Sequence, residues 1–521
     1  MHDIVSVRPI VGLEVHIELA TRSKVFTAGP NPAARDAAAD DAAPNALVDP
    51  VVLALPGALP VLNREAVEVA MRVGLALGCQ IADVTRWDRK AYTYPDLPKG
   101  YQISQYELPL CFDGQVDLPA LDDAGDPDWT RRGRSIGIIR AHLEEDAGKL
   151  LHEAPGGTPV PSGAGGSIVD LNRAGTPLLE IVTQPDFASA DEALVFCRLL
   201  RQTCRFIGAS LGVMQQGHMR FEPNINCELR LRGGGVVRTP IVEIKNLNSF
   251  RAVHAAIACE LAQQPKRWVE GGATGGPGSK TTRGWDDTRM VTTPQREKEE
   301  AQDYRYFPDP DLPPLAVDTA WRDEVAAGLP ELPAARLRRY VGEDGLSASD
   351  ATVLVEERAD AELFDVSVDV AIGEGLDRKR AAKEVRNVLL EHGARLANER
   401  GVSIGALGLD GAQIGAIAAM RAGDDISAAN AGVLLQKLTE PGYDGRDARA
   451  VAEYEGWLSI RDTALLERWC DEVIAENPGI VEQIRAGKQQ AVGRLIGDVK
   501  KRSGGSADAK AVRALLLERI S

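Results

Sequence analysis

The sequence predicts an α+β fold in which a β-rich N-terminal part is followed by an all-helical C-terminal part. Apolar and polar residues alternate strictly over residues 11–19, and a period of two is typical of a half-buried β-strand. A second strand-like run, IGII, covers residues 136–139. After Pro314 the chain is rich in Ala, Leu, Glu and Arg with helical periodicity.

Helices and loops are also signalled within the N-terminal part. Ser189 and Glu192 form a capping box, and apolar residues at helical spacing follow, which predicts a helix over 189–206. Another helix is expected from about 249 to 263. The Ala/Asp/Pro-rich residues 30–49 and the Gly-rich residues 271–279 are expected to be loops.

The chain of 521 residues is too long for one hydrophobic core. We expect three domains: a catalytic cradle over 1–315, a helical domain over 316–402, and a helical tail domain over 403–521. The glycine-bounded stretch 401–411 is expected to be the hinge between the two helical parts.

The net charge of −16 argues against a general nucleic-acid binder. Residues 481–521 differ, because nine Lys and Arg there oppose four Asp and Glu, a balance of +5. The tail is therefore expected to contact a polyanion, through Lys488, Arg494, Lys500, Lys501 and Arg502.

The seven cysteines are scattered and none forms a CxxC pair, which indicates neither a disulfide framework nor a thiolate zinc site. The N-terminus shows no signal peptide, and no run of about 18 apolar residues indicates a membrane span. These features predict a cytoplasmic protein.

Two acidic stretches are candidates for a metal site. Glu14, His16 and Glu18 share one face of the first strand, and the run EED at 144–146 follows the second. If the strands share a sheet, the carboxylates converge and a divalent cation relieves their repulsion. Oxygen ligands with one imidazole suit Mg²⁺ or Mn²⁺. The alternative is an amphipathic strand with a solvated face. Glu180, placed among apolar residues, is either paired or a metal ligand.

Neither a Walker loop nor a Rossmann turn is present, so a nucleotide would be held through metal-bridged phosphates. Residues 88–106 interleave tyrosines with cations, including Arg89 and Lys90, which suits stacking and phosphate contact at an unpaired nucleotide end. Alternatively these tyrosines pack on the core. The similar segment around Arg305 is also explained by a hinge. Lys245 and Asn248 open a helix whose N-terminus suits an anion, or Asn248 is simply its cap.

Several ordered blocks together resemble the B subunit of the aspartyl/glutamyl-tRNA amidotransferase over essentially the whole chain. They include GLEVH (12–16), RKAYTYPD (89–96), YQISQ (101–105) and HLEEDAGK (142–149). Further blocks are VDLNRAGTP (169–177), EIKNLNSF (243–250), DYRYFP (303–308) and GKQQAVG (487–493).

The resemblance implies a heterotrimer with the glutaminase, or A, subunit and the small C subunit. The B subunit uses ATP and Mg²⁺ to phosphorylate the side-chain carboxylate of Glu or Asp misacylated on tRNA(Gln) or tRNA(Asn), and ammonia from the glutaminase displaces the phosphate. The cradle would resemble glutamine synthetase, and the helical tail would contact tRNA. Whether Glu-tRNA, Asp-tRNA or both are substrates stays open.

The resemblance also implies roles for single residues. It places Mg²⁺ ligands at Glu14, His16 and Glu145, with Glu144 and Glu180 close by. We expect Glu14, His16, Glu145 and Lys90 to be catalytic, and ATP contacts from Arg89, Lys245, Asn248 and Arg305.

The chain departs from the family pattern at three places, one of which is Gln215–Gln216 where members usually have two Glu. The family's CxC…CxxC zinc positions read TAG (27–29) and VDPV (48–51), so no zinc is expected. Glu222 stands where members usually have Asp, which leaves its role open. A metal-dependent hydrolase and a non-catalytic tRNA-binding protein are the competing hypotheses.

Overall fold

The computed structural model describes residues 4–34, 42–151, 153–154, 158–159, 167–276, 279–295, 304–443, 445–459, 463–486, 488–504 and 506–520. Part of the expected loop 30–49, and motif residues Asp303 and Gly487, lie outside the described residues. The chain forms two compact units, Met1–Ala335 and Arg336–Ser521. The first is rich in strands and the second is helical, which confirms the α+β class.

A large sheet is the core of the first unit, with strand order β17-β16-β15-β13-β1-β12-β7-β6-β2. Every neighbouring pair is antiparallel except β15 and β16. The strands are β1 (Ile4–Glu18), β2 (Gln80–Ile81), β6 (Cys111–Leu121), β7 (Pro127–Glu145), β12 (Pro177–Thr183), β13 (Met219–Leu231), β15 (Val242–Lys245), β16 (Thr281–Asp286) and β17 (Val291–Pro294), and β14 (Val236–Arg238) pairs with β13.

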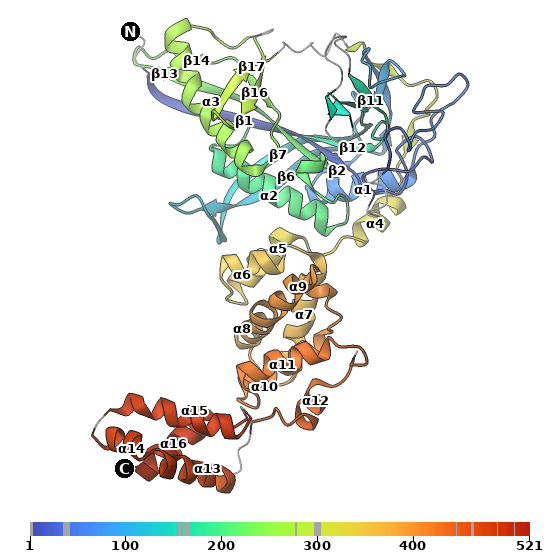
Figure 1. Cartoon of the computed structure of the whole chain (residues 1–521). Coiled ribbons are helices and arrows are strands. Elements are labelled where there is room, and N and C mark those ends of the chain that lie inside the picture. The colour runs from blue at the N-terminus through green and yellow to red at the C-terminus, as the bar shows by residue number, and fades with distance from the viewer. Residues whose placement is uncertain are drawn as a thin grey trace. The chain divides into compact units, whose positions relative to one another are not determined.

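The two faces of this sheet differ in character, as the period of two in β1 predicts. Val11, Leu13, Val15 and Ile17 are at most 1% exposed. Helices pack on the sheet: α1 (Arg64–Ala76) against β6 and β7, α2 (Ala190–Phe206) against β6, and α3 (Phe250–Gly271) against β13 and β17 (Figure 1). The polar residues of β1 are therefore left for the other face.

Serine caps start both long helices of this unit. The Ser189 hydroxyl accepts the Glu192 N–H at 3.1 Å, which confirms the expected start of α2. Ser249 caps α3, but this helix continues past the expected end at 263, through Pro265, to Gly271. Packing against β13 outweighs the proline, because Gln264 donates to the Ile225 carbonyl at 2.9 Å.

A smaller sheet brings two aromatic segments together. It consists of β18 (Phe307–Pro308), β4 (Asp88–Ala91) and β5 (Tyr101–Ser104), in that order. Shorter pairs complete the unit, together with α4 (Thr319–Ala327): β3 (Val84–Thr85) with β19 (Leu315–Ala316), β8 (Lys149–Leu151) with β11 (Ile168–Asp170), and β9 (Glu153–Ala154) with β10 (Thr158–Pro159).

The helices on both sides of the domain boundary expected at 402/403 pack together. Helix α10 (Gly411–Ala422) lies against α7 (Arg358–Gly373) and α8 (Arg378–Asn387). A Cβ at Gly415 would lie 2.6 Å from Val370, so glycine permits this close approach. The neighbouring elements are α5 (Pro333–Gly342), α6 (Ala348–Leu354), a π-helix (Val388–Gly393), α9 (Ala394–Arg400), α11 (Ala428–Leu438) and α12 (Ala448–Tyr454).

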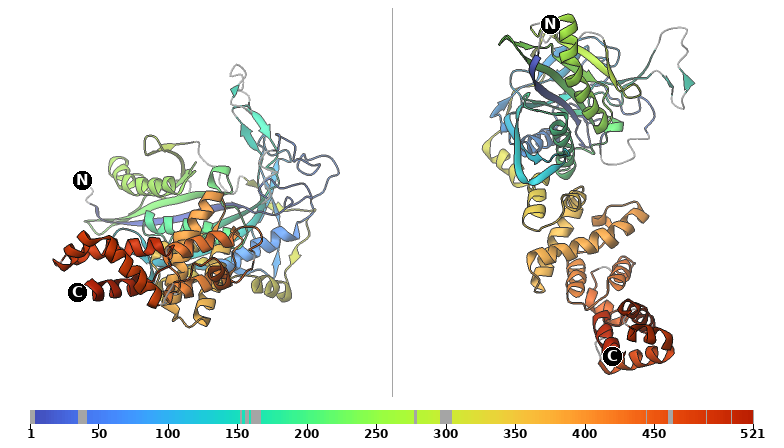
Figure 2. Two further views of the ribbon diagram at one scale, coloured as in Figure 1. Left: turned by 60° about the horizontal axis from the view of Figure 1, so that its bottom comes forward. Right: turned by 90° about the vertical axis from the view of Figure 1, so that its left-hand side faces the viewer.

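The last four helices have a hydrophobic core of their own. They are α13 (Thr463–Glu476), α14 (Pro478–Arg485), α15 (Val492–Arg502) and α16 (Ala509–Ile520), drawn in red in Figure 2. Their shared core includes Leu466, Cys470, Leu495 and Leu516. We therefore propose that the tail domain begins near 463 rather than at 403.

Among the described residues, none of the helices combines the length and the apolar character needed to cross a membrane.

Candidate functional site

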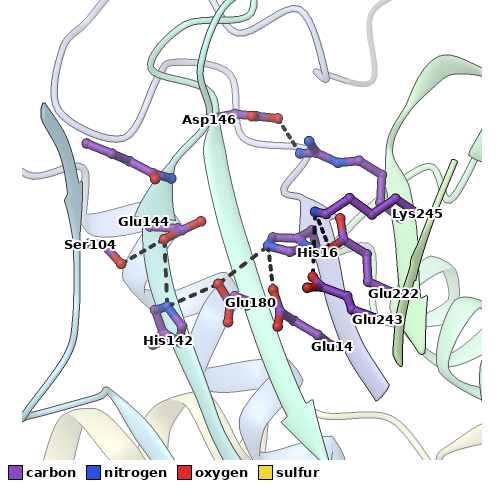
Figure 3. A network of polar contacts seen from close by, with 12 residues as sticks. Glu14, His16, Ser104, His142, Glu144, Asp146, Glu180, Glu222, Glu243 and Lys245 are labelled. Atoms are coloured by element: carbon purple, nitrogen blue, oxygen red, sulfur yellow. Dashed lines mark hydrogen bonds and ion pairs between the residues drawn. The ribbon is translucent and has the colours of Figure 1, made fainter. Parts of the chain in front are cut away.

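The polar face of the sheet gathers carboxylates and imidazoles from five neighbouring strands, β15, β13, β1, β12 and β7. In the strand register His16 stands opposite Glu180, and Glu180 stands opposite His142. On the other side of β1, Glu14 stands opposite Glu222 of β13. Because these partners lie directly across antiparallel strands, their side chains share one face (Figure 3).

Glu180 is the centre of this cluster. Its Oε2 lies 3.4 Å from Nε2 of His16 and 3.6 Å from Nε2 of His142. The outer carboxylates complete a row, with Glu14 Oε1 3.7 Å from His16 Nε2 and Glu144 Oε2 3.7 Å from His142 Nε2. The structure thus brings together Glu14, His16, Glu144 and Glu180, as the sequence suggests.

Three overlapping sets in this cluster have ligand atoms within 4.8 Å of one another: Glu14–His16–Glu180, His142–Glu144–Glu180 and Glu14–Glu222–Glu243. Carboxylates dominate each set, and two sets add one imidazole. This donor chemistry suits a hard divalent cation such as Mg²⁺ or Mn²⁺.

Charge balance in the cluster favours ionised carboxylates. Burial lowers the pKa of His16, but Glu180 and the neighbouring carboxylates outweigh it and raise the pKa to about 9. Burial likewise opposes ionisation of Glu180, yet His142 and His16 hold its pKa well below the usual value. Without a cation, His16 therefore keeps a proton that offsets part of the negative charge.

Lys90 of β4 belongs to the same electrostatic environment. Burial lowers the pKa of Lys90, but Glu144, Tyr306 and Glu180 raise it above its ordinary value. Its Nζ lies 4.9 Å from the centre of the Tyr304 ring. The ammonium therefore stays charged close to the carboxylates of the cluster.

At the β13–β15 side, Lys245 closes the cluster. Its Nζ lies 2.8 Å from Glu222 Oε2 and 3.6 Å from Glu243 Oε1. Sequence reasoning missed His142 and Glu243 as candidate ligands. The available signal was the alternation within HLEE and EIK, which gives His142 the face of Glu144 and Glu243 the face of Lys245.

Glu145 does not join the cluster, contrary to expectation. It follows Glu144 directly on β7 and so points to the opposite face. There its Oε2 lies 2.6 Å from Lys99 Nζ, and its Oε1 accepts the Ile103 N–H at 2.8 Å. The side chain is paired within the protein and none of the three candidate metal sets includes it.

Arg89 is likewise committed elsewhere. Its guanidinium lies 2.8 Å from both Asp309 and Asp311 and 4.3 Å from the centre of the Tyr101 ring. These contacts fasten β4 to the segment after β18. The Arg89 guanidinium would therefore have to give up these ion pairs before it could contact ATP.

Two other expected ATP contacts lie on the surface. Arg305 is exposed and has a left-handed backbone, with φ of 48°. Asn248 is also exposed, and Ser249 rather than Asn248 caps α3.

The tyrosines of the two aromatic segments pack on one another. Tyr106 and Tyr306 stack with ring centres 4.5 Å apart, and Tyr92 and Tyr304 meet edge to face at 5.9 Å. This agrees with the alternative interpretation, in which the tyrosines are part of the protein's own packing.

Hydrogen bonds connect the two loops, 27–29 and 48–51, at which the family's zinc ligands would lie. The Thr27 hydroxyl donates to Asp49 Oδ2 at 2.7 Å, and Asp49 Oδ1 accepts the Val51 N–H at 2.8 Å. These oxygen contacts connect the two loops directly. The expectation of no zinc stays a prediction.

The basic residues expected to contact a polyanion lie on or near α15. Lys488, Arg494 and Lys501 are exposed, and Lys500 is half-buried. Arg502 differs, because its guanidinium lies 2.8 Å from Glu472 and also contacts Glu476.

Comparison with known proteins decides the family. Residues 9–323 match the GatB/GatE catalytic domain, and residues 372–520 match the GatB domain. The chain belongs to the GatB/GatE family. The catalytic-domain match contains the whole cluster on β1, β7, β12, β13 and β15.

Individual relatives agree over nearly their whole lengths. The aspartyl/glutamyl-tRNA(Asn/Gln) amidotransferase B subunit of Rhodopirellula baltica is 41% identical, over 99% of this chain and 97% of the relative. The B subunits of Thermosynechococcus vestitus and Moorella thermoacetica are 42% and 41% identical, each over 98% of this chain and over 96% and 99% of the relative.

Proposed function

We propose that this chain is the B subunit of an aspartyl/glutamyl-tRNA(Asn/Gln) amidotransferase. It would convert Glu-tRNA(Gln), Asp-tRNA(Asn) or both to the amidated forms, as an ATP-dependent carbon–nitrogen ligase with glutamine as amido donor. The observation that carries the proposal is the carboxylate–imidazole cluster on one sheet face, within a family match that spans the chain.

The chemistry of the cluster fits this reaction. A carboxylate is a poor acylating group at neutral pH, so phosphorylation of the substrate's side chain supplies a leaving group before ammonia attacks. Phosphoryl transfer asks a protein mainly for charge neutralisation and positioning. Mg²⁺ held by Glu14, His16 and Glu180, with Glu144 close by, would neutralise the phosphates of ATP.

Two lysines add positive charge from the protein itself. Lys90 lies on the Glu144 side of the cluster and Lys245 on the Glu222 side. We infer that they orient phosphate oxygens from opposite ends of the sheet face and stabilise the charge that develops during transfer.

The name of the relatives implies partner subunits, and we propose a heterotrimer with the glutaminase, or A, subunit and the small C subunit. The substrate would be misacylated tRNA, and basic residues of the helical tail would contribute to its binding. We also propose that the protein is located in the cytoplasm. The seven cysteines are all free, and the reducing cytoplasm would keep them as thiols.

The test is product formation by the purified trimer given Glu-tRNA(Gln), ATP and glutamine. We expect Gln-tRNA(Gln) and ATP turnover that depends on aminoacyl-tRNA. Glu180→Gln should abolish transamidation while the partner's glutaminase activity persists. ATP hydrolysis independent of tRNA would favour a metal-dependent hydrolase, and no ATP turnover would favour a non-catalytic tRNA-binding protein.

A further inference from the structure

A small cavity adjoins the cluster at the end of β1. It has a volume of about 120 Å³ and is lined by Glu18, Lys149, Asp170, Asn172, Arg173 and His218, among others. Glu18 lies two residues along the strand from His16, so both side chains point to the same face, roughly 7 Å apart. The cavity therefore continues the polar face on which the metal candidates lie.

Glu18 is the unusual group in this cavity. It is 4% exposed, and its Oε1 has no hydrogen-bond partner among the described residues. The Asp146 carboxylate beside it is better satisfied, because it contacts Arg220 and lies 3.5 Å from Arg173. The Glu18 carboxyl group itself shares a hydrogen bond with Asp146 and lies close to Arg220 and Arg173, so its Oε1 is the one atom left for a donor that a ligand brings.

The rest of the cavity wall shows how such a ligand would be oriented. Arg173 is fixed in place, because it donates to the carbonyls of Ala147 at 2.9 Å and Gly148 at 2.7 Å. Lys149 is exposed at the same cavity. The acceptor is thus buried and a cation lies at the surface, which favours a ligand with an inner cationic group and an outer anionic one.

We infer that Glu18 binds the α-ammonium group of the amino acid esterified to tRNA. This inference rests on the proposed function. The α-nitrogen lies about 4 to 5 Å from the side-chain carboxyl carbon in a Glu residue and about 3 to 4 Å from it in an Asp residue. A substrate whose carboxylate reacts at the cluster therefore places its ammonium toward Glu18, and Lys149 faces the phosphate of the terminal nucleotide.

The ammonium is tested by replacing it in the substrate. Ribozyme-catalysed acylation of tRNA(Gln) with 2-hydroxyglutarate gives the 2-hydroxyglutaryl form, which keeps the side-chain carboxylate and the ester. The wild-type trimer should favour the amino substrate over the hydroxy substrate by about 10- to 150-fold in kcat/KM, the range of a charged hydrogen bond. Equal kcat/KM for the two substrates would overturn the inference, and this measurement needs no variant.

The variant Glu18→Gln tests whether Glu18 causes the preference for the amino substrate over the hydroxy substrate. In the full trimer it should slow the amino substrate by a similar factor and change the hydroxy substrate less than about threefold. Glu65→Gln, on an exposed position of α1, is the matched control and should retain the wild-type preference. Equal slowing of both substrates would assign Glu18 a structural role and refute the inference. Failure of the wild-type trimer to amidate either substrate would instead refute the proposed function.

Discussion

Replacing Glu145 tests whether this carboxylate serves the fold or the metal site. Glu145 is 3% exposed, pairs with Lys99 and accepts the Ile103 N–H. A glutamine retains an acceptor for Ile103 but leaves the Lys99 ammonium, 9% exposed, without a counter-charge. Removing one partner of a buried ion pair costs about 3–5 kcal/mol. Glu145→Gln should therefore destabilise the protein by about this amount.

Urea unfolding of the purified chain, followed by tryptophan fluorescence, measures the change. Trp87 is a suitable reporter, because it is 1% exposed and donates to the Leu143 carbonyl of β7 at 3.1 Å. Calorimetric titration with Mn²⁺ gives the second readout. Glu145→Gln should retain the wild-type cation affinity within about twofold, whereas Glu180→Gln should lose at least tenfold, since Glu180 belongs to two of the candidate sets.

A double variant separates the ion pair from other effects of the substitution. Lys99→Met combined with Glu145→Gln removes both charges at similar volume and keeps the acceptor for the Ile103 N–H, and replacement of a buried ion pair by uncharged residues is often nearly neutral. The double variant should therefore recover most of the lost stability. Unchanged stability of Glu145→Gln together with lost Mn²⁺ affinity would refute this reasoning and return Glu145 to the metal site.

Three further outcomes are expected. Cation affinity should rise about tenfold from pH 7 to 8 and level off above about pH 9, because bound metal must displace the proton that His16 holds up to a pKa of about 9. Calorimetry at several pH values measures this rise. In the control variant His16→Gln the affinity should depend less on pH. Asp49→Ala should cost about 1–3 kcal/mol in urea unfolding, because Thr27 and nearby N–H groups lose their acceptor, while elemental analysis of the wild-type chain should find no stoichiometric zinc. Lys501→Ala should reduce the slope of log K for tRNA binding against log salt concentration by about 0.7 to 0.9, and Arg502→Ala should reduce it by less, because Arg502 already pairs with Glu472. Filter binding across salt concentrations measures both slopes. Equal slopes for the two variants would contradict the assignment of tRNA binding to the tail.

Much of the fold is predictable because its signals are local. The alternation in β1, the serine caps of α2 and α3, and the change to helical composition after Pro314 each act within a few residues. The end of α3 is not local, because it depends on contacts with β13 on the far side of Pro265. The 402/403 boundary depends likewise on α10 packing against α7 and α8, which composition alone does not reveal.

The candidate site shows the same division between local and distant information. The acidic motifs identify which residue types converge, but the register of β12 between β1 and β7 determines which atoms meet. Glu180 becomes central because it stands between two histidines, His16 and His142, on different neighbouring strands. The separation of His16, His142 and Glu180 along the sequence does not predict that these three side chains meet across three strands.

One physical cause explains why two expected site residues, Arg89 and Glu145, lie outside the cluster. Arg89–Lys90 and Glu144–Glu145 are adjacent pairs on strands β4 and β7, and adjacent residues on a strand point to opposite faces. In each pair one member, Lys90 or Glu144, faces the cluster, and the other forms ion pairs on the opposite side. The charges that face the cluster and the charges that hold the surrounding strands together are therefore neighbours in sequence. Substitution of one member of a pair would weaken cation or substrate binding, and substitution of the other would destabilise the fold. Stability and cation affinity, measured on the same variant, tell the two effects apart.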